Sequence, residues 1–421
     1  MIASDIKMIS SRGWCELQAQ VKSDTAKKPF LLRYCFPPSF EEFVSAENGD
    51  PFLAALLLPA MKRHETLEVP VPVSRRLLRA TNEIQALYNS WDKSLSKVRI
   101  NAPVRKEESS VTLRSPRHGL FFSCGVDSYY SLFTNVKNHP NDEATITDLI
   151  VVRGFDNPFQ ARRPSAFGTV LANARKVSRE LQKNTLPVAT NVRDFAIQFV
   201  RWDRLYHGAA MASVGLALES VFHRIYIASS FSRGQLFPWG SHPALDPLWS
   251  TERLSLSHDG FEARRVDKIR FIAQFPIAMD TLRVCTLRPF PGNVYNCGLC
   301  EKCLRTMVGL HIAGALERSR TLPHSIDLGV LRSIRIPEEL REFTEELVTD
   351  LGSSKTDLAI RSALEEALSV SARSKPARAF FSRFLTVVAY APPLLRLWVR
   401  LWRALRRSPP SSIFDLFRFP R

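Results

Sequence analysis

Two common nucleotide-binding signatures are missing from this sequence of 421 residues. None of its 17 glycines precedes a lysine, which excludes a Walker loop, and the G-x-G-x-x-G pattern of dinucleotide-binding folds does not occur either. No run reaches the roughly 18 uncharged apolar residues that a membrane-spanning helix needs. The seven cysteines are too sparse for a secreted disulfide framework, and the N-terminus lacks the apolar core of a signal peptide. We therefore expect a cytoplasmic protein with reduced thiols.

Negative charge is scarce at one end of the chain. The formal net charge is +17, and residues 371–421 contain eleven Lys or Arg but a single acid, so this segment alone supplies ten of those charges. Within it, residues 394–407 have the periodicity of an amphipathic helix, with arginine on one face. Arginine opposite tryptophan and leucine is typical of helices that bind a membrane surface or an acidic protein. Packing against the rest of the protein is the alternative.

The first 112 residues are interpreted as an accessory domain that contains β-strands. Residues 14–21 alternate between apolar and polar positions, as a half-buried strand does, and residues 30–36 are a second candidate strand. Residues 67–73 alternate as well, but their prolines confine them to a sheet edge, and residues 74–87 have a helical pattern. No catalytic combination of side chains is recognisable here. We expect a role in folding or in shaping a substrate site.

From residue 118 onward, short apolar strands alternate with helical patterns. Alternation of this kind predicts an α/β fold with a doubly wound parallel sheet, in which ligands bind beyond the carboxyl ends of the strands. The expected strands are residues 120–122, 148–153, 186–191 and 225–229, and the expected helices are residues 126–136, 165–183 and 206–220. We place this domain at residues 113–312, followed by a helical segment at 313–373 and the basic tail at 374–421.

A short polar turn lies between the first of these strands and its helix, where an α/β nucleotide site belongs. It reads Ser123-Cys124-Gly125-Val126-Asp127-Ser128. Backbone N–H groups in such a turn can surround an anion, and the helix N-terminus adds partial positive charge. Gly125 allows close approach of the backbone to phosphate, and Ser123 and Ser128 can donate hydroxyl hydrogen bonds. Asp127 cannot attract phosphate by charge, so it is a candidate Mg²⁺ ligand or helix cap.

Four of the seven cysteines cluster within nineteen residues. They are Cys285, Cys297, Cys300 and Cys303. Thiolates at this spacing favour a tetrahedral zinc ion, and Gly298 eases the tight turn between them. Four sulfur ligands leave no open coordination position, so we expect a structural site whose metal contributes to folding. The alternatives are an iron–sulfur cluster or four buried or redox-active cysteines without a metal.

Together, the two motifs resemble those of a known enzyme group. Residues 123–128 are similar to the SGGxDS signature of PP-loop ATP pyrophosphatases, with Cys124 in place of the usual second glycine. Such a loop followed by this cysteine cluster resembles 7-cyano-7-deazaguanine synthase over about residues 118–312, and Phe155-Asp156 lies where that family has an acidic turn. The resemblance implies a HUP-like nucleotide fold with zinc, and an ATP and Mg²⁺ site formed by residues 123–128 with Phe155 and Asp156.

The chemistry that this resemblance implies is carbon–nitrogen ligation. ATP adenylates a carboxylate and releases pyrophosphate, and ammonia or another amine then displaces AMP to give an amide or, after a second activation, a nitrile. AMP is a good leaving group, whereas the oxygen of a free carboxylate is a poor one. The carboxylate belongs to a small molecule such as a 7-deazapurine or to a modified macromolecule, and a homodimer is one candidate assembly.

The chain departs from the synthase in length and in its substrate loop. The synthase is short, whereas this chain has additional segments at both ends, and residues 229–252 form a polar, aromatic loop after the fourth strand. Long loops at strand ends often carry function. The candidate substrate-binding residues are Ser229, Ser230, His242 and Asp246. The candidate catalytic residues are Asp127, Ser128, His207 and Asp246. Each also has a structural explanation as a helix cap, a loop hydrogen bond or a core contact.

Two other functions fit the same motifs. A PP-loop enzyme that transfers sulfur to nucleic acid would need a reactive cysteine outside the zinc set, and Cys15, Cys35 and Cys124 are the candidates. A non-catalytic module that docks a membrane or a protein through its tail would bind ATP without releasing AMP. Formation of AMP and substitution of the three thiols distinguish these functions from ligation.

Overall fold

The computed structural model describes most of the chain but not its basic tail. The described residues are 1–10, 13–24, 28–106, 117–140, 143–156, 159, 165–285 and 295–373. The amphipathic helix expected at residues 394–407 therefore lies outside the described residues. The same is true of the boundary expected between residues 112 and 113.

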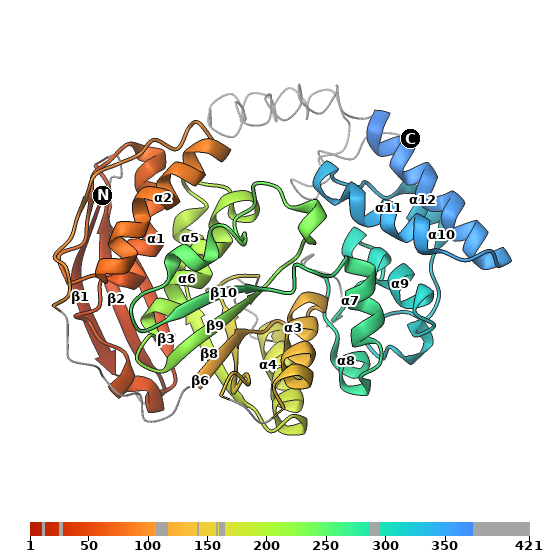
Figure 1. Ribbon diagram of the computed structural model, residues 1–421, viewed down its shortest axis with the longest axis horizontal. Coiled ribbons are helices and arrows are strands. Elements are labelled where there is room, and N and C mark those ends of the chain that lie inside the picture. Colours follow the sequence, from red (N-terminus) through yellow and green to blue (C-terminus); the bar gives the residue numbers. More distant parts are fainter. Residues whose placement is uncertain are drawn as a thin grey trace, which may run out of the picture.

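A ten-stranded sheet runs through the described part of the molecule in the order β10-β9-β6-β7-β8-β3-β2-β1-β4-β5 (Figure 1). The strands are β1 Ile2–Ser10, β2 Cys15–Lys22, β3 Phe30–Phe36, β4 Leu67–Glu68, β5 Ile100–Asn101, β6 Arg117–Phe121, β7 Asp148–Arg153, β8 Asn184–Thr190, β9 Phe222–Ala228 and β10 Ser255–Asp259. Within this sheet, six of the nine neighbouring pairs are parallel. The predicted α/β class with a mostly parallel sheet is thereby confirmed.

The parallel region winds outward from β6 in both directions. The chain passes from β6 to β7 and β8 on one side, and then returns to add β9 and β10 on the other. The order of the strands therefore reverses between β6 and β9. In open sheets of this type, the crevice beyond the carboxyl ends of the strands at such a switch point is where ligands bind.

Both faces of the parallel region are covered by helices. Side chains along the strands alternate, so that Phe121 and Ile150 join one buried core while Leu120 and Leu149 join another. Helices α1 (Asp50–Arg63), α2 (Arg75–Trp91) and α6 (His207–Ala217) contribute to the first core, and α3 (Val126–Asn138) and α4 (Ser165–Glu180) to the second. A short helix, α5 (Val192–Ala196), follows β8.

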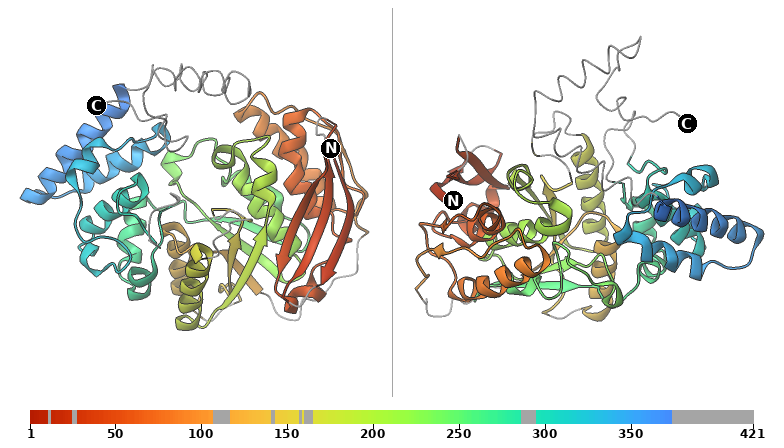
Figure 2. Two further views of the ribbon diagram at one scale, coloured as in Figure 1. Left: turned by 180° about the vertical axis from the view of Figure 1, so that it is seen from behind. Right: turned by 90° about the horizontal axis from the view of Figure 1, so that it is seen from above.

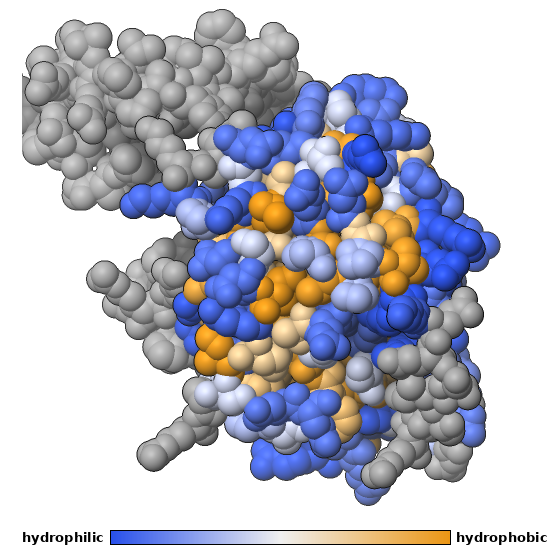
Figure 3. Space-filling model, turned by 90° about the vertical axis from the view of Figure 1, so that its left-hand side faces the viewer, coloured by the Kyte–Doolittle hydropathy of each residue, from blue (hydrophilic) through white to orange (hydrophobic). Residues whose placement is uncertain are grey.

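The N-terminal segment continues the same sheet. Strand β3 pairs with β8 in antiparallel fashion, through Tyr34 opposite Thr190 and Cys35 opposite Ala189. The apolar side chains of β1, β2 and α1 belong to the core that also contains α6. This end of the molecule presents apolar side chains gathered among hydrophilic ones (Figure 3). Whether residues 1–112 form a domain of their own stays a prediction.

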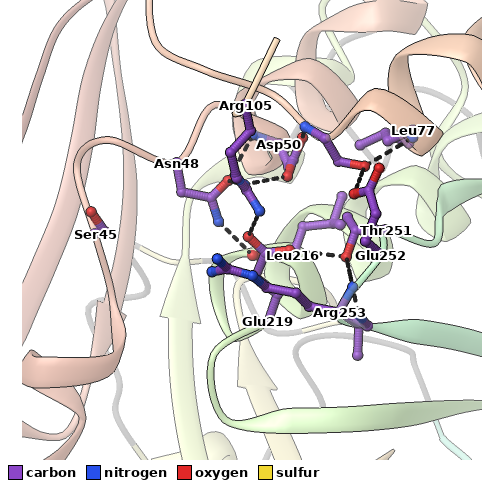
Figure 4. Close-up of polar contacts among 12 residues, drawn as sticks. Ser45, Asn48, Asp50, Leu77, Arg105, Leu216, Glu219, Thr251, Glu252 and Arg253 are labelled. Atoms are coloured by element: carbon purple, nitrogen blue, oxygen red, sulfur yellow. Dashed lines mark hydrogen bonds and ion pairs between the residues drawn. The ribbon is translucent and has the colours of Figure 1, made fainter. Parts of the chain in front are cut away.

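A buried charged network ties the N-terminal segment to the parallel region (Figure 4). Arg105 contacts Asp50 at 2.7 Å and Glu219 at 2.6 Å, and the carboxyl groups of Asp50 and Glu219 are almost fully buried. Nearby, the Ser74 hydroxyl donates a hydrogen bond to Glu252 at 2.6 Å. Burial, reinforced by the neighbouring Glu219, raises the pKa of Asp50 to about 7. The network links elements far apart in the sequence through paired charges.

The opposite end of the molecule consists of helices (Figures 1 and 2). They are α7 Arg265–Ile272, α8 Pro276–Thr281, α9 Glu301–Ile312, α10 Leu328–Ser333, α11 Arg341–Asp350 and α12 Lys355–Arg373. Single turns of 3₁₀ helix are Pro38–Phe43, Arg233–Gln235, Asp246–Trp249, Leu316–Arg318 and Glu338–Leu340. Across the described ranges, no helix combines the length and the apolar character that a membrane crossing requires.

Candidate functional site

A cavity of about 810 Å³ opens at the switch point of the sheet. It lies beyond the carboxyl ends of β6, β7 and β9, where the strand order reverses. A cavity of this size falls in the range of small-molecule sites. The predicted residues that line it are Ser123, Asp127, Ser128, Phe155, Asp156, His207 and Ser230. The fold therefore brings the polar turn, the acidic turn and the start of α6 to one place.

The polar turn is organised by the hydroxyl group of Ser128. Its oxygen accepts hydrogen bonds from the backbone N–H groups of Gly125 at 3.2 Å and Ser123 at 3.4 Å, and it donates to the carbonyl of Gly125 at 3.1 Å. The Ser128 hydroxyl thus lies where converging N–H groups would receive an anion. Ser123 and Asp127 border the cavity, whereas Val126 is buried at the start of α3.

Cys124 adopts the left-handed backbone conformation, with φ of 58°. Glycine adopts that conformation at little cost, whereas a residue with a side chain rarely does. The side chain of Cys124 is fully buried and packs into the core beside α3, away from the cavity. Burial raises the pKa of its thiol to about 12. The side chain of Cys124 therefore does not obstruct the cavity side of the turn. Its left-handed backbone conformation introduces local strain.

Asp127 is held by cations. Both of its carboxylate oxygens lie within hydrogen-bond distance of Arg265 Nη1, at 2.6 and 2.7 Å. The ammonium group of Lys268 lies 3.7 Å from the same carboxylate, donates to the carbonyl of Ser229 at 2.7 Å and is almost fully buried. Burial lowers the pKa of Lys268, although Asp127 opposes this effect. Basic charge is thus concentrated immediately beside the turn.

A third buried cation, Arg305, lies in the same region on α9. Its side chain is 6% exposed, and its Nε atom lies 2.9 Å from Glu301. Burial lowers the pKa of Arg305, and the positive charge of Arg265 contributes in the same direction. Two further basic residues, Arg283 and Lys302, line the cavity itself. The side of the cavity near the turn therefore suits a ligand with several negative charges.

A π-helical turn, Trp202–Tyr206, shapes the opposite wall. Its wider hydrogen bond runs from the N–H of His207 to the carbonyl of Trp202, and Trp202, Asp203 and His207 all reach the cavity. The guanidinium group of Arg193 lies over the Trp202 ring at 4.9 Å. Burial lowers the pKa of His207, so its imidazole is neutral near pH 7. Such single π-turns are frequent at functional sites.

Three of the predicted substrate residues do not line the cavity. Asp246 is fully buried and accepts hydrogen bonds from the Ser241 hydroxyl at 2.6 Å and from His258 Nδ1 at 2.7 Å. His242 packs its ring against Trp91. Ser229 donates its hydroxyl to a carbonyl within its own loop. The structure gives Asp246 and His242 the role of ordering the loop, and their participation in catalysis or binding stays a prediction.

The four clustered cysteines are brought together as predicted. Their sulfur atoms lie within 4.8 Å of one another, and two pairs, Cys297–Cys303 and Cys300–Cys285, are 3.7 and 3.9 Å apart. Zinc–sulfur bonds of about 2.3 Å at tetrahedral angles place sulfur atoms roughly 3.8 Å apart, so the arrangement fits this metal. The cluster can thus hold a metal such as zinc.

The turn of the cysteine cluster also positions functional residues. Gly298 has φ of 71°, and backbone N–H groups of residues 299 and 300 donate to the sulfur of Cys297. Helix α9 begins directly after Cys300, and its first turns place Lys302 at the cavity and Arg305 behind it. A metal bound here would fix the start of α9 and therefore the position of both cations.

Several residues at or beside the cavity were not found from the sequence. Arg265 and Lys268, beside the polar turn, occur in a highly charged stretch that resembles a solvent-exposed helix. Trp202 lines the cavity and begins a π-turn, which leaves no mark on hydrophobic periodicity. No family model, curated protein or solved structure matches the chain. The function of the cavity is therefore inferred from its own residues.

Proposed function

We propose that this protein is an ATP-dependent carbon–nitrogen ligase of the PP-loop type, built on a HUP-like nucleotide fold. The observation that carries the proposal is the place of the polar turn. It joins a central strand to its helix at the switch point of the sheet and borders a cavity that Arg283 and Lys302 line, with Arg265 and Lys268 beside the turn. A nucleotide with its phosphates at residues 123–128 and Lys302 suits this arrangement.

The proposed reaction begins with attack of a substrate carboxylate on the α-phosphorus of ATP. Pyrophosphate leaves, and Arg283 and Lys302 neutralise the negative charge that develops near the turn. An amine then adds to the acyl carbon of the adenylate, and AMP departs. Neutral His207 on the opposite wall can accept the proton that the amine releases.

The predicted Mg²⁺ site at Asp127 competes with protein cations. A divalent ion on this carboxylate would have to displace Arg265, which contacts both oxygens at 2.7 Å or less. The Asp127 carboxylate is therefore occupied by Arg265 and is not free to bind Mg²⁺. The Asp127 carboxylate instead holds Arg265 and Lys268 beside the turn.

The cysteine residues weigh against sulfur transfer. Cys15, Cys35 and Cys124 are all buried, and burial raises the pKa of each thiol. For Cys35 and Cys124 the pKa reaches about 12, so the reactive thiolate is scarce at neutral pH. Binding of a membrane surface or an acidic protein by the basic tail stays a prediction, as do a homodimer and a cytoplasmic location.

The deciding assay combines the purified protein with ATP, Mg²⁺, ammonium and 7-carboxy-7-deazaguanine. We expect AMP and pyrophosphate, together with a product whose mass corresponds to an amide or a nitrile. AMP without a modified substrate would support the nucleotide chemistry with a different carboxylate. Absence of AMP with every carboxylate tried would leave a binding module, and formation of ADP would contradict the PP-loop assignment.

Metal content tests the cysteine cluster separately. We expect about one equivalent of zinc per chain, which would be lost on replacement of Cys297 by serine or on treatment with a strong chelator. Replacement of the buried Cys15 by serine is the control and should leave the zinc content unchanged. Iron with acid-labile sulfide in place of zinc would contradict the structural zinc site.

A further inference from the structure

One face of helix α11 contacts the elements that surround the cavity. The residues of this face are Phe343, Glu346 and Asp350, and Glu339 in the 3₁₀ turn that leads into the helix continues the same three- and four-residue spacing. Glu339 pairs with Arg204 of the π-turn at 3.1 Å, and Glu346 accepts a hydrogen bond from Gln235 at 2.6 Å. Asp350 pairs with Arg270 of α7 at 2.7 Å. Helix α11 and the 3₁₀ turn before it are therefore joined to the π-turn, to the loop after β9 and to α7.

Phe343 lies at the centre of this face. Its ring stacks on the ring of Phe231, with centroids 5.1 Å apart and planes inclined by 8°. The guanidinium group of Arg305 lies 4.6 Å from the centre of the Phe343 ring, and that of Arg265 lies 5.9 Å from it. The phenylalanine thus supports both arginines with the electron-rich face of a buried ring.

The two arginines have unused hydrogen-bonding capacity. Within the described residues, buried Nε of Arg265 and buried Nη1 of Arg305 have no hydrogen-bond partner. An unsatisfied buried donor is costly, and a charged one more so, which makes a partner outside the chain's own residues the natural explanation. Among the residues that the structure describes, the acids paired with these two arginines are Asp127 and Glu301. An anion with several oxygens would provide the missing acceptors.

We propose that the C-terminal helical segment is part of the nucleotide site, with Phe343 of α11 acting as the positioning residue that holds Arg265 and Arg305 for the phosphate chain. This inference rests on the proposed nucleotide function. It assigns a role to residues 313–373, which the resemblance to the shorter synthase leaves without one. The same helix face orders the loop that carries Phe231 and Trp239, because Gln235 within that loop is held by Glu346.

Binding of non-hydrolysable nucleotide to the full-length protein tests this role. The probes are α,β-methylene-ATP, pyrophosphate and AMP, each measured by titration calorimetry with Mg²⁺ present. The variants are Phe343→Ala, Phe343→Trp as the conservative rescue, and Leu347→Ala as the matched control. Leu347 lies on the same helix and is equally buried, but it packs into the apolar cluster between α9, α10 and α12. The unfolding midpoint and the zinc content are measured for every variant.

We expect Phe343→Ala to weaken binding of α,β-methylene-ATP and pyrophosphate about tenfold while AMP binding changes less than twofold, since the arginines lose the ring that orders them. Phe343→Trp should restore binding, and Leu347→Ala should reduce only stability. Unchanged pyrophosphate affinity in Phe343→Ala, or equal weakening in Leu347→Ala, would overturn the inference. A wild-type protein that binds none of the probes would overturn both the inference and the proposed function.

Discussion

Two buried charged clusters in this protein differ in how their charges are balanced. At the N-terminal end, Arg105 is shared between the buried carboxylates of Asp50 and Glu219, so that acids outnumber the arginine that joins them. Beside the cavity, Arg265 and Lys268 converge on the single carboxylate of Asp127, and Arg305 lies nearby. Cations therefore outnumber the acid that joins them beside the polar turn.

The difference separates a structural cluster from a ligand-binding one. Asp50, Arg105 and Glu219 do not line the cavity, and their network connects segments of the fold, so its cost is offset by the contacts it makes within the protein. The cluster at Asp127 has donors without acceptors and lies at a cavity, which is the pattern expected where an anion binds. Four substitutions can test this contrast.

The largest effect is expected for Arg105→Met. Removal of the guanidinium group leaves two buried carboxylates facing each other without a cation, which should reduce the free energy of unfolding by about 3 to 5 kcal/mol. Urea denaturation at pH 7 measures the change. Nucleotide affinity at temperatures where the variant is folded should be that of the wild type. A loss below about 1 kcal/mol would show that the network is not structural.

Asp127→Asn should reduce activity much more than stability, which is the opposite of what we expect for Arg105→Met. We expect AMP formation to fall about a hundredfold, because Arg265 and Lys268 lose the carboxylate that places them at the turn, and loss of a preorganised charge costs on the order of 100-fold in rate. The free energy of unfolding should fall by less than in Arg105→Met, because the Asp127 carboxylate is 21% exposed and an asparagine side chain keeps an acceptor oxygen for Arg265. Initial rates of AMP release and urea denaturation give the two numbers. If the Asp127→Asn variant were unstable yet fully active, the cluster at Asp127 would be structural and would not bind the ligand.

Asp50→Asn tests the pH dependence of the N-terminal network. Because the pKa of Asp50 is raised from 3.8 to about 7 in the folded state, its proton stabilises the fold at low pH and that contribution is lost as pH rises through 7. Relative to the asparagine variant, wild-type stability should thus decline by roughly 3 kcal/mol between pH 5 and pH 8. Parallel stability curves for the two proteins would show that Asp50 is ionised throughout this range.

The smallest effect is expected for Cys124→Gly, which belongs to neither cluster. Glycine relieves the left-handed conformation by roughly 1 kcal/mol, and removal of a buried thiol costs about the same. We therefore expect a change in the free energy of unfolding of less than about 1 kcal/mol. Thermal unfolding of the two proteins is a sufficient measurement. A strong destabilisation would mean that the packing of the thiol dominates the turn.

Sequence patterns predicted the strands and the turn that form the site better than they predicted its charged side chains. Strand β7 and the strand β3 have the predicted bounds, and the polar turn lies where the alternation of strands and helices places it. Helix α1 was missed because nearly all of its residues are buried and no apolar stripe marks it. Strand β10 was missed because it is short and polar.

Tertiary contacts explain the remaining differences at the site. Asp246 was selected as a substrate residue because it lies in a polar loop, and its partner His258 is on a strand outside that loop. Arg265 and Phe343 likewise meet only in the folded protein. Pairings of this kind depend on packing between distant elements, which local periodicity does not encode.

The pairing of β3 with β8 has a consequence for any shortened form of this protein. A fragment that begins at β6 would retain the polar turn and the cysteines, but β8 would become the edge of its sheet. The backbone N–H and C=O groups of Ala189 and Thr190, which pair with β3 in the intact protein, would then be available to another chain. We therefore expect a fragment without the N-terminal strands to associate through this edge more readily than the full-length protein does.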